Sequence, residues 1–68
     1  MSNQYYEITI EGPLSAQWSD WFEGLTITSQ PDGLTRLVGT VADQAALFGV
    51  LGKVRDLGLT LVSVNSRR

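Results

Sequence analysis

Residues 43–57, DQAALFGVLGKVRDL, carry the pattern that decides the fold. Asp43 stands where a side chain can accept a backbone N–H of a first helical turn. Gly58 follows the stretch, and glycine enters the left-handed conformation that ends a helix without strain. Between them the apolar residues recur at helical spacing on one side: Leu47, Val50, Leu51, Val54 and Leu57. The stretch predicts an amphipathic helix that lies on an apolar surface.

Strands on either side of this helix would supply that surface. Apolar and polar residues alternate in YYEITIE (5–11), and residues 25–30, 34–41 and 59–65 are rich in strand formers. The sequence Gln30-Pro31-Asp32-Gly33 between the second and third segments is typical of a tight hairpin turn. In the last segment the inward parity stays open, because Leu59 and Leu61 compete with Val62 and Val64 for the inner face.

A shorter helix is predicted over residues 14–24, with Ser15 as its N-cap and Gly24 as its stop. Its large side chains share the spacing i, i+3, i+4, i+7 and are expected to face the core: Trp18, Trp21, Phe22 and Leu25. Gly39 lies on the inner side of the third strand segment. We expect an aromatic ring from this first helix to fill the space that Gly39 leaves.

The order strand, helix, strand, strand, helix, strand predicts an α+β fold, the ferredoxin-like split βαβ sandwich. Two helices would cover one face of a four-stranded antiparallel sheet, within a single domain spanning residues 1–68. The ordered core would run from about 5 to 65, and residues 66–68 would form a loose tail. The open face of the sheet would be mostly polar: Glu7, Thr9, Thr28, Arg36, Val38 and Thr40.

Composition narrows the function mainly by exclusion. The 68 residues include neither cysteine nor histidine, so disulfides, zinc sites built on Cys or His, and Ser–His or Cys–His nucleophile pairs are excluded. A formal net charge of −2 is unfavourable for binding nucleic acid, which requires neutralisation of phosphates. The sequence shows no signal peptide and no apolar run long enough to span a bilayer. We therefore expect a cytoplasmic protein that is not an enzyme, has no cofactor or metal, and binds neither nucleic acid nor membrane.

The back of the main helix is the candidate interface. Each mid-helix glycine costs roughly 1 kcal/mol relative to alanine, so two of them on one side indicate either close approach by another molecule or an exposed face that happens to be small. We expect this surface, or the edge of the last strand, to form a contact between copies of the chain. The residues of this helix-back surface are Phe48, Ala45, Gly49, Gly52 and Asp56.

Other candidate sites have simpler structural interpretations. Glu7 and Glu11 are four residues apart on an exposed strand face and have no obvious catalytic partner. Tyr5 projects from the open face, where an RNA-binding sheet would carry stacking aromatics, yet the third strand segment has no matching aromatic residue. The loop 11–14 could hold a small ligand, and its Gly and Pro also suit a bare turn.

The motifs Trp18-x-x-Trp21-Phe22 and Asp43-Gln44-Ala45-Ala46-Leu47 lie in a sequence that resembles a family of short, mainly uncharacterised bacterial and archaeal proteins. The resemblance covers about residues 6–64, and it implies the fold without implying an activity. The strand order is also similar to that of ACT ligand-sensing domains, by analogy of fold only. We therefore predict a small, self-associating interaction or accessory module. The alternatives are an ACT-like sensor of a small-molecule ligand, or an enzyme subunit whose site another protein completes.

Overall fold

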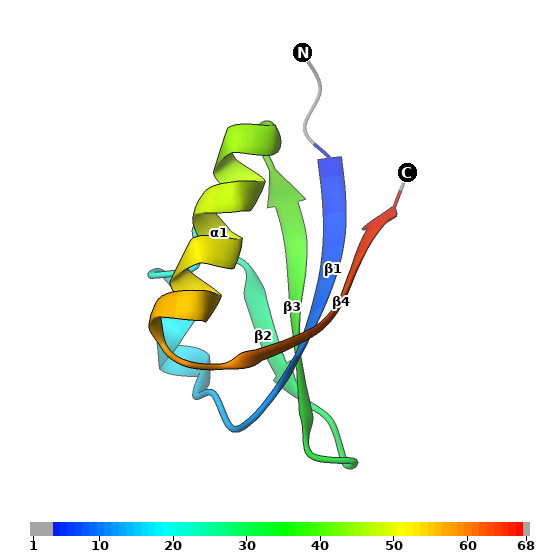
Figure 1. Cartoon of the computed structure of the whole chain (residues 1–68). Coiled ribbons are helices and arrows are strands. Elements are labelled where there is room, and N and C mark those ends of the chain that lie inside the picture. Colours follow the sequence, from blue (N-terminus) through cyan, green and yellow to red (C-terminus); the bar gives the residue numbers. More distant parts are fainter. Residues whose placement is uncertain (1–3, 68) are drawn as a thin grey trace.

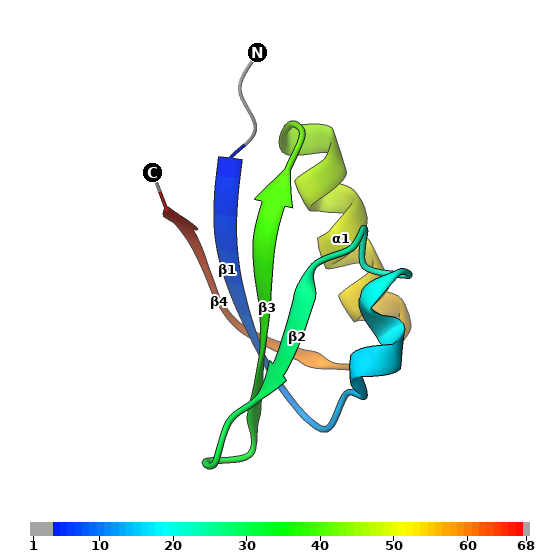
Figure 2. The ribbon, with the colours of Figure 1, turned by 180° about the vertical axis from the view of Figure 1, so that it is seen from behind.

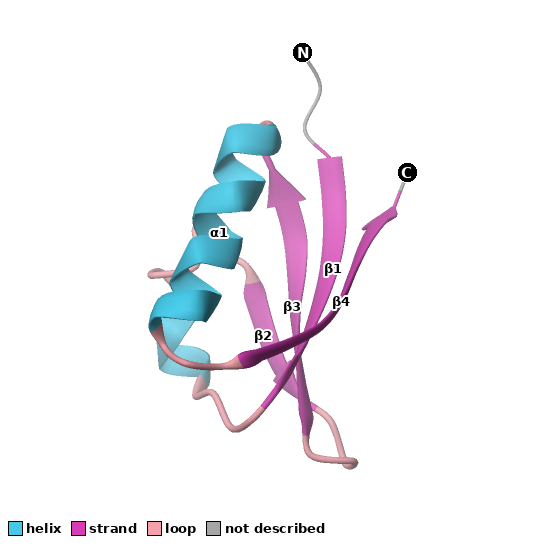
Figure 3. Ribbon diagram, in the orientation of Figure 1, coloured by secondary structure: helices cyan, strands magenta, loops and turns pink. Residues whose placement is uncertain are grey.

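A four-stranded antiparallel sheet and one α-helix make up the fold in the computed structural model, which describes residues 4–67 (Figures 1 and 3). The order of strands across the sheet is β2-β3-β1-β4. The main helix α1 and the short segment around η1 pack on the same face of the sheet, with α1 nearer β4 and η1 nearer β2 (Figures 1 and 2). Along the chain the elements are β1 (Gln4–Glu11), η1 (Ala16–Ser19), β2 (Thr26–Ser29), β3 (Leu34–Val41), α1 (Gln44–Asp56) and β4 (Thr60–Arg67).

The predicted ferredoxin-like split βαβ sandwich is wrong, because the first of its two helices is not an α-helix. Residues 16–19 form a single 3-10 turn, and tight turns follow up to Gly24. Ser15 does cap this turn, since its hydroxyl accepts from the backbone N–H of Gln17 at 3.2 Å. The predicted cap is therefore present, and the predicted helix is absent.

Local polar contacts explain why this segment stops after one turn. The Ser19 hydroxyl donates to the carbonyl of Leu25 at 2.7 Å, a bond that competes with continued helix. Glu23 and Gly24 both take positive φ, 62° and 80°, and the Gly24 N–H returns to the Ser19 carbonyl at 2.9 Å. So short a segment gains little from helical hydrogen bonding because nucleation is costly. The compact winding still buries Phe22 completely.

The main helix agrees with its prediction at both ends. The Asp43 carboxylate accepts from the Ala46 N–H at 2.8 Å, and Gly58 ends the helix with φ 74°. Leu47, Val50 and Val54 are buried. The two remaining residues of the predicted stripe, Leu51 and Leu57, are only partly buried against the core.

The core lies between the sheet and the two segments above it. Ile8, Ile10 and Leu37 come from the sheet, and Phe22 and Val50 from the cover; all five are fully buried. The strand register explains why these residues of the sheet are buried, because paired residues of neighbouring strands point to the same face. Ile8 pairs with Leu37, whereas Glu7 pairs with Val38 on the opposite face. The sheet therefore has one apolar face and one open face.

Gly39 admits a leucine and not the aromatic ring that we expected. A Cβ at this position would lie 2.8 Å from Cδ2 of Leu25, and the Gly39 φ is 156°. Leu25 is almost fully buried. The expectation about the space was right and the expected occupant was wrong, because the shortened first segment brings Leu25 over β3.

A β-bulge in β4 determines which side chains of the last strand face the core. Thr9 pairs with Ser63 and the next residue of β1, Ile10, pairs with Leu61, so Val62 is an extra residue on β4. The bulge places both Leu61 and Val64 on the face that carries α1. β4 also continues through Ser66 and Arg67, which pair with Tyr6 and Tyr5. Those two residues are therefore not the loose tail that we predicted, and residue 68 lies outside the described part of the chain.

Candidate functional site

The predicted helix-back surface lies on the outside of α1. Phe48 has 63% of its surface exposed, the largest value among the large apolar side chains that the structure describes. Ala45, Gly49 and Asp56 are exposed, and Gly52 is half-buried. The Asp56 carboxylate contacts the neighbouring Arg55 guanidinium at 3.2 Å, an exposed pair of the kind that contributes little to stability.

Packing within the chain does not account for the two helix glycines. A Cβ on Gly49 would meet no other heavy atom within 4 Å, and a Cβ on Gly52 would meet only Nη2 of Arg55 at 3.7 Å. Alanine would fit at either position and favour the helix by about 1 kcal/mol. The glycines are therefore compatible with close approach by a second molecule or with the absence of selection for stability.

An aromatic corner joins the η1 segment to the main helix. Trp18 and Trp21 meet edge to face with ring centroids 5.5 Å apart, and Trp21 meets Phe22 in the same way at 5.2 Å. We expected all three in the core, yet only Phe22 is buried, and the two Trp side chains keep 39% and 38% of their surface exposed. The shortened segment holds one ring inside and leaves the indoles at the margin.

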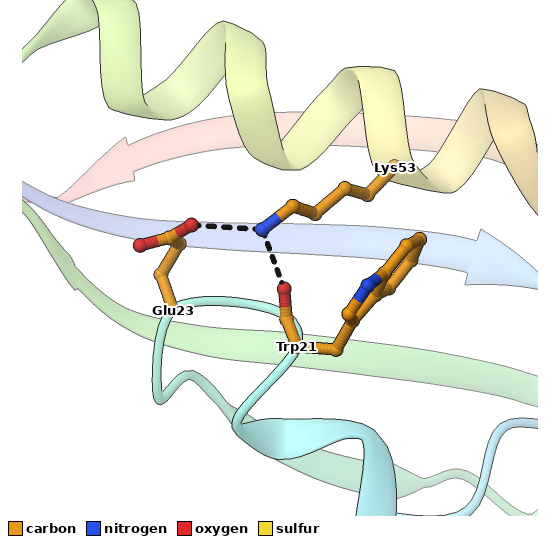
Figure 4. A network of polar contacts seen from close by, with 3 residues as sticks. All are labelled: Trp21, Glu23 and Lys53. Atoms are coloured by element: carbon orange, nitrogen blue, oxygen red, sulfur yellow. Dashed lines mark hydrogen bonds and ion pairs between the residues drawn. The ribbon is translucent and has the colours of Figure 1, made fainter.

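Lys53 fastens this corner (Figure 4). Its ammonium donates to the Trp21 carbonyl at 2.7 Å and to Oε2 of Glu23 at 2.8 Å, and it lies 5.4 Å from the centroid of a Trp21 ring. No pattern in the sequence indicates this contact, because the partners of Lys53 are 30 and 32 residues away from it and neither belongs to a recognisable motif. We assign the corner a structural role, since the Lys53 ammonium, the Trp21 carbonyl and the Glu23 carboxylate bind one another within the chain.

The open face of the sheet is hollowed on the side of β2. The hollow has a volume of about 390 Å³ and brings together hydroxyl, amide and charged side chains. The Arg36 guanidinium lies 3.7 Å from the Glu7 carboxylate, and its Nε is buried without a hydrogen-bond partner among the described residues. The lining residues are Tyr5, Glu7, Thr26, Thr28, Gln30, Arg36, Val38 and Gly39. Most of these residues were expected on the open face, but the hollow that they line was not predicted.

The loop 11–14, considered as a ligand corner, is tied into the fold. The Thr35 hydroxyl, which is buried, donates to the Gly12 carbonyl at 2.8 Å. A Cβ on Gly12 would meet Leu59 at 3.3 Å, and Leu14 is buried in the core. Its residues therefore serve packing and the turn. Glu7 and Glu11 of β1 lie on the open face of the sheet. Their partners on the neighbouring strand β3 are Val38 and Leu34.

The outer edge of the sheet at β4 has no neighbouring strand in the described part of the chain. β4 pairs with β1 alone, and its other side presents backbone groups outward. Leu61 and Val62 keep 46% and 50% of their surface exposed at this edge. From Thr60 to Ser66 the strand carries no charged side chain.

Within residues 4–67, no three His, Cys, Asp or Glu side chains gather closely enough to hold a metal ion. No helix in the same range has the length and apolar character needed to cross a bilayer.

These surfaces belong to a small domain of one four-stranded antiparallel sheet and one α-helix. Its described part has an open sheet face, a sheet edge at β4 without a neighbouring strand, and a partly apolar helix back. The chain belongs to a family described as Domain of unknown function (DUF8691), whose model matches residues 5–65. Comparisons with curated proteins and with solved structures gave no match. The family membership agrees with the resemblance to uncharacterised proteins and assigns no activity.

Proposed function

We propose that this chain is a small non-catalytic interaction module that self-associates. The observation that supports this most directly is the apolar surface left uncovered by the fold. Phe48, Leu61 and Val62 keep 63%, 46% and 50% of their surface exposed. Scattered exposure of single apolar residues is ordinary, whereas these three lie on α1 and β4, two elements that are adjacent in the fold (Figure 1).

The size of the chain adds a second argument. A domain of about 60 residues buries only about 60% of the surface that its unfolded chain exposes, so its stability alone is marginal. Burying the exposed side chains against a second copy would add stability at roughly 25 cal/mol for each Å² of apolar surface removed from water. Self-association would therefore couple folding to assembly.

Sedimentation equilibrium over a range of protein concentrations tests this proposal. We expect the mass to rise from that of one chain toward that of two, and the unfolding temperature to rise with concentration. A mass of one chain at every concentration, with an unfolding temperature that does not depend on concentration, would refute it.

The hollow on the open face supports a second candidate function, the binding of a small ligand. Arg36 lines a hollow large enough for a metabolite, and 42% of its side chain stays exposed beside the Glu7 carboxylate. The exposed N–H groups of its guanidinium are donors for a ligand oxygen. A small carboxylate is the class of ligand that fits a guanidinium donor.

Thermal shift with a panel of small carboxylic acids tests the second candidate. We expect a ligand that raises the unfolding temperature of the wild type and leaves an Arg36→Met variant unchanged. Thr9→Val, which removes a polar group on the same face outside the hollow, is the control and should retain the shift. A panel without any Arg36-dependent shift contradicts binding of carboxylates in the hollow.

A further inference from the structure

We infer that two copies of this chain pair through the free edge of β4 (Thr60–Arg67), so that two four-stranded sheets join into one continuous sheet about a two-fold axis. This inference rests on the proposed self-association and names the surface that mediates it. It selects the strand edge over the helix-back surface.

The length and composition of β4 make its edge the better of the two sheet edges for pairing. β4 has eight residues, whereas β2 at the opposite edge has four. Proteins commonly block a long edge with lysine or proline, because unpaired N–H and C=O groups recruit another strand. Residues 60–66, TLVSVNS, contain neither. An added strand would satisfy these backbone groups by the same hydrogen bonding that joins β4 to β1.

The uncharged edge of β4 suits pairing with a second copy of the same chain. A two-fold axis places the same surface against itself and makes the two edge strands antiparallel. Like charges directly opposite each other across a pair of strands are destabilising. Between Thr60 and Ser66 the edge carries no charge, so two identical edges meet without repulsion.

Apolar side chains beside the edge favour the same arrangement. Leu61 lies on the face that carries α1, opposite the buried Ile10, yet α1 leaves 46% of it exposed. Phe48 precedes Lys53 by five residues, which places it about 140° around the helix from the side that contacts η1. η1 lies on the β2 side of α1 (Figures 1 and 2), so Phe48 lies on the part of α1 turned away from η1. A neighbouring copy at β4 would cover Leu61.

The bulge at Val62 limits the part of β4 that pairs. A bulge bends its strand and interrupts the regular pattern of hydrogen bonds. Residues 63–67 lie beyond it in regular pairing with β1. We therefore place the two-fold axis within residues 63–66, which keeps the two copies of Arg67 from facing each other, and Val62 at the rim of the contact.

Single-cysteine crosslinking locates the axis, because the native chain has no cysteine. We would place one cysteine at each position from 62 to 66 in turn and oxidise gently. Residues facing each other in an antiparallel pair have Cα atoms about 4.5–5.5 Å apart, within the range of about 4.4–6.8 Å that a disulfide spans. Thr28→Cys on β2 and Ala45→Cys on the helix back are matched exposed controls.

We expect crosslinking to peak at one or two neighbouring positions of β4, on the order of tenfold faster than at the controls. The mass of the wild type in sedimentation distinguishes failure of self-association from failure of pairing at the β4 edge. A wild type of one chain refutes the proposed self-association itself. A wild type of two chains with fast crosslinking at Ala45→Cys, or with none along β4, refutes only the strand edge.

A charged variant gives an independent measurement that does not depend on disulfide geometry. Ser63→Lys adds a charge on the open face beside the edge, and Thr28→Lys adds the same charge beside the other edge. We expect the dissociation constant of the Ser63→Lys dimer to rise by about tenfold, and that of Thr28→Lys to stay near the wild-type value. Circular dichroism checks that both variants fold. Equal dissociation constants for folded variants would contradict pairing at β4.

Discussion

Replacing Lys53 with methionine should weaken the attachment of the aromatic corner to α1. The substitution keeps much of the aliphatic length and removes the ammonium that contacts the Trp21 carbonyl at 2.7 Å and Glu23 at 2.8 Å. A hydrogen bond to a charged group contributes about 1.5–3 kcal/mol when buried. The Lys53 side chain is 29% exposed and that of Glu23 is 52% exposed, so solvent screening reduces the ion pair to about 0.2–1 kcal/mol.

The contact with the ring of Trp21 adds about 0.5–1 kcal/mol at a site of this exposure. Together with a screened bond to the carbonyl, these contributions give an expected loss of about 1–2 kcal/mol in the free energy of unfolding. For a domain of this size such a loss corresponds to a fall of roughly 4–16 °C in the unfolding temperature. Urea titration followed by circular dichroism measures it as a lower midpoint with an unchanged slope.

Arg55→Met is the matched control, since Arg55 also lies in the last turn of α1 but its side chain is 80% exposed and forms an ion pair with its neighbour Asp56. We expect it to change the free energy of unfolding by less than about 0.5 kcal/mol. A double-mutant cycle of Lys53→Met with Glu23→Gln separates the ion pair from the contacts with Trp21. If Lys53→Met costs no more than Arg55→Met, the corner is not fastened by Lys53.

The remaining predictions concern packing at three positions. Gly39→Ala should destabilise by about 1–3 kcal/mol in urea unfolding, because its Cβ would lie 2.8 Å from the buried Leu25; an unchanged midpoint would mean that Leu25 moves freely. Gly49→Ala should raise stability by up to about 1 kcal/mol, since its Cβ meets open space; a loss that depends on protein concentration would instead indicate that a second copy covers this face. Leu51→Ala should cost about 2 kcal/mol, the low end for buried leucine, because Leu51 is only partly buried; a loss below about 0.5 kcal/mol would mean that it does not pack on the core.

Helix caps and turns were predicted correctly where they depend on residues that are close together in the sequence. The cap at Asp43 and the stop at Gly58 bound the main helix as predicted, and the Pro-Asp-Gly turn forms a hairpin in which the Gln30 N–H donates to the Leu34 carbonyl at 2.7 Å. These features depend on side chains within a few residues of the backbone groups that they satisfy. Sequence alone therefore predicted them correctly.

The first helix shows where such signals fail. The spacing of Trp18, Trp21 and Phe22 suits a helix, yet the hydroxyl of Ser19 and the positive φ of Glu23 end it after one turn. Hydrophobic periodicity reports which side chains seek the core, and a tight turn that buries Phe22 meets part of the same requirement. The choice between these solutions depends on polar contacts such as that of the Ser19 hydroxyl with the Leu25 carbonyl, which hydrophobic spacing does not indicate.

Of the candidate surfaces, the helix-back surface could be predicted from the sequence and the hollow could not. The exposed position of the helix-back surface follows from the stripe on the other side of α1, so its location could be anticipated. The hollow around Arg36 depends on the register between β1, β2 and β3, which brings Thr28 opposite Arg36 and Glu7 opposite Val38. The strand segments alone do not specify how the side chains of three strands enclose a space.

The extra residue at Val62 has a consequence for how this family tolerates changes in length. Removing Val62 would leave Thr9 opposite Ser63 and Ile10 opposite Leu61 in an unbroken ladder, so Leu61 and Val64 would stay on the same face. An added residue at any other point of the last strand would need a bulge of its own, because otherwise the side chains on one side of it would change faces. Natural variants that lack one residue at this point should therefore keep the same core contacts and have a straighter last strand.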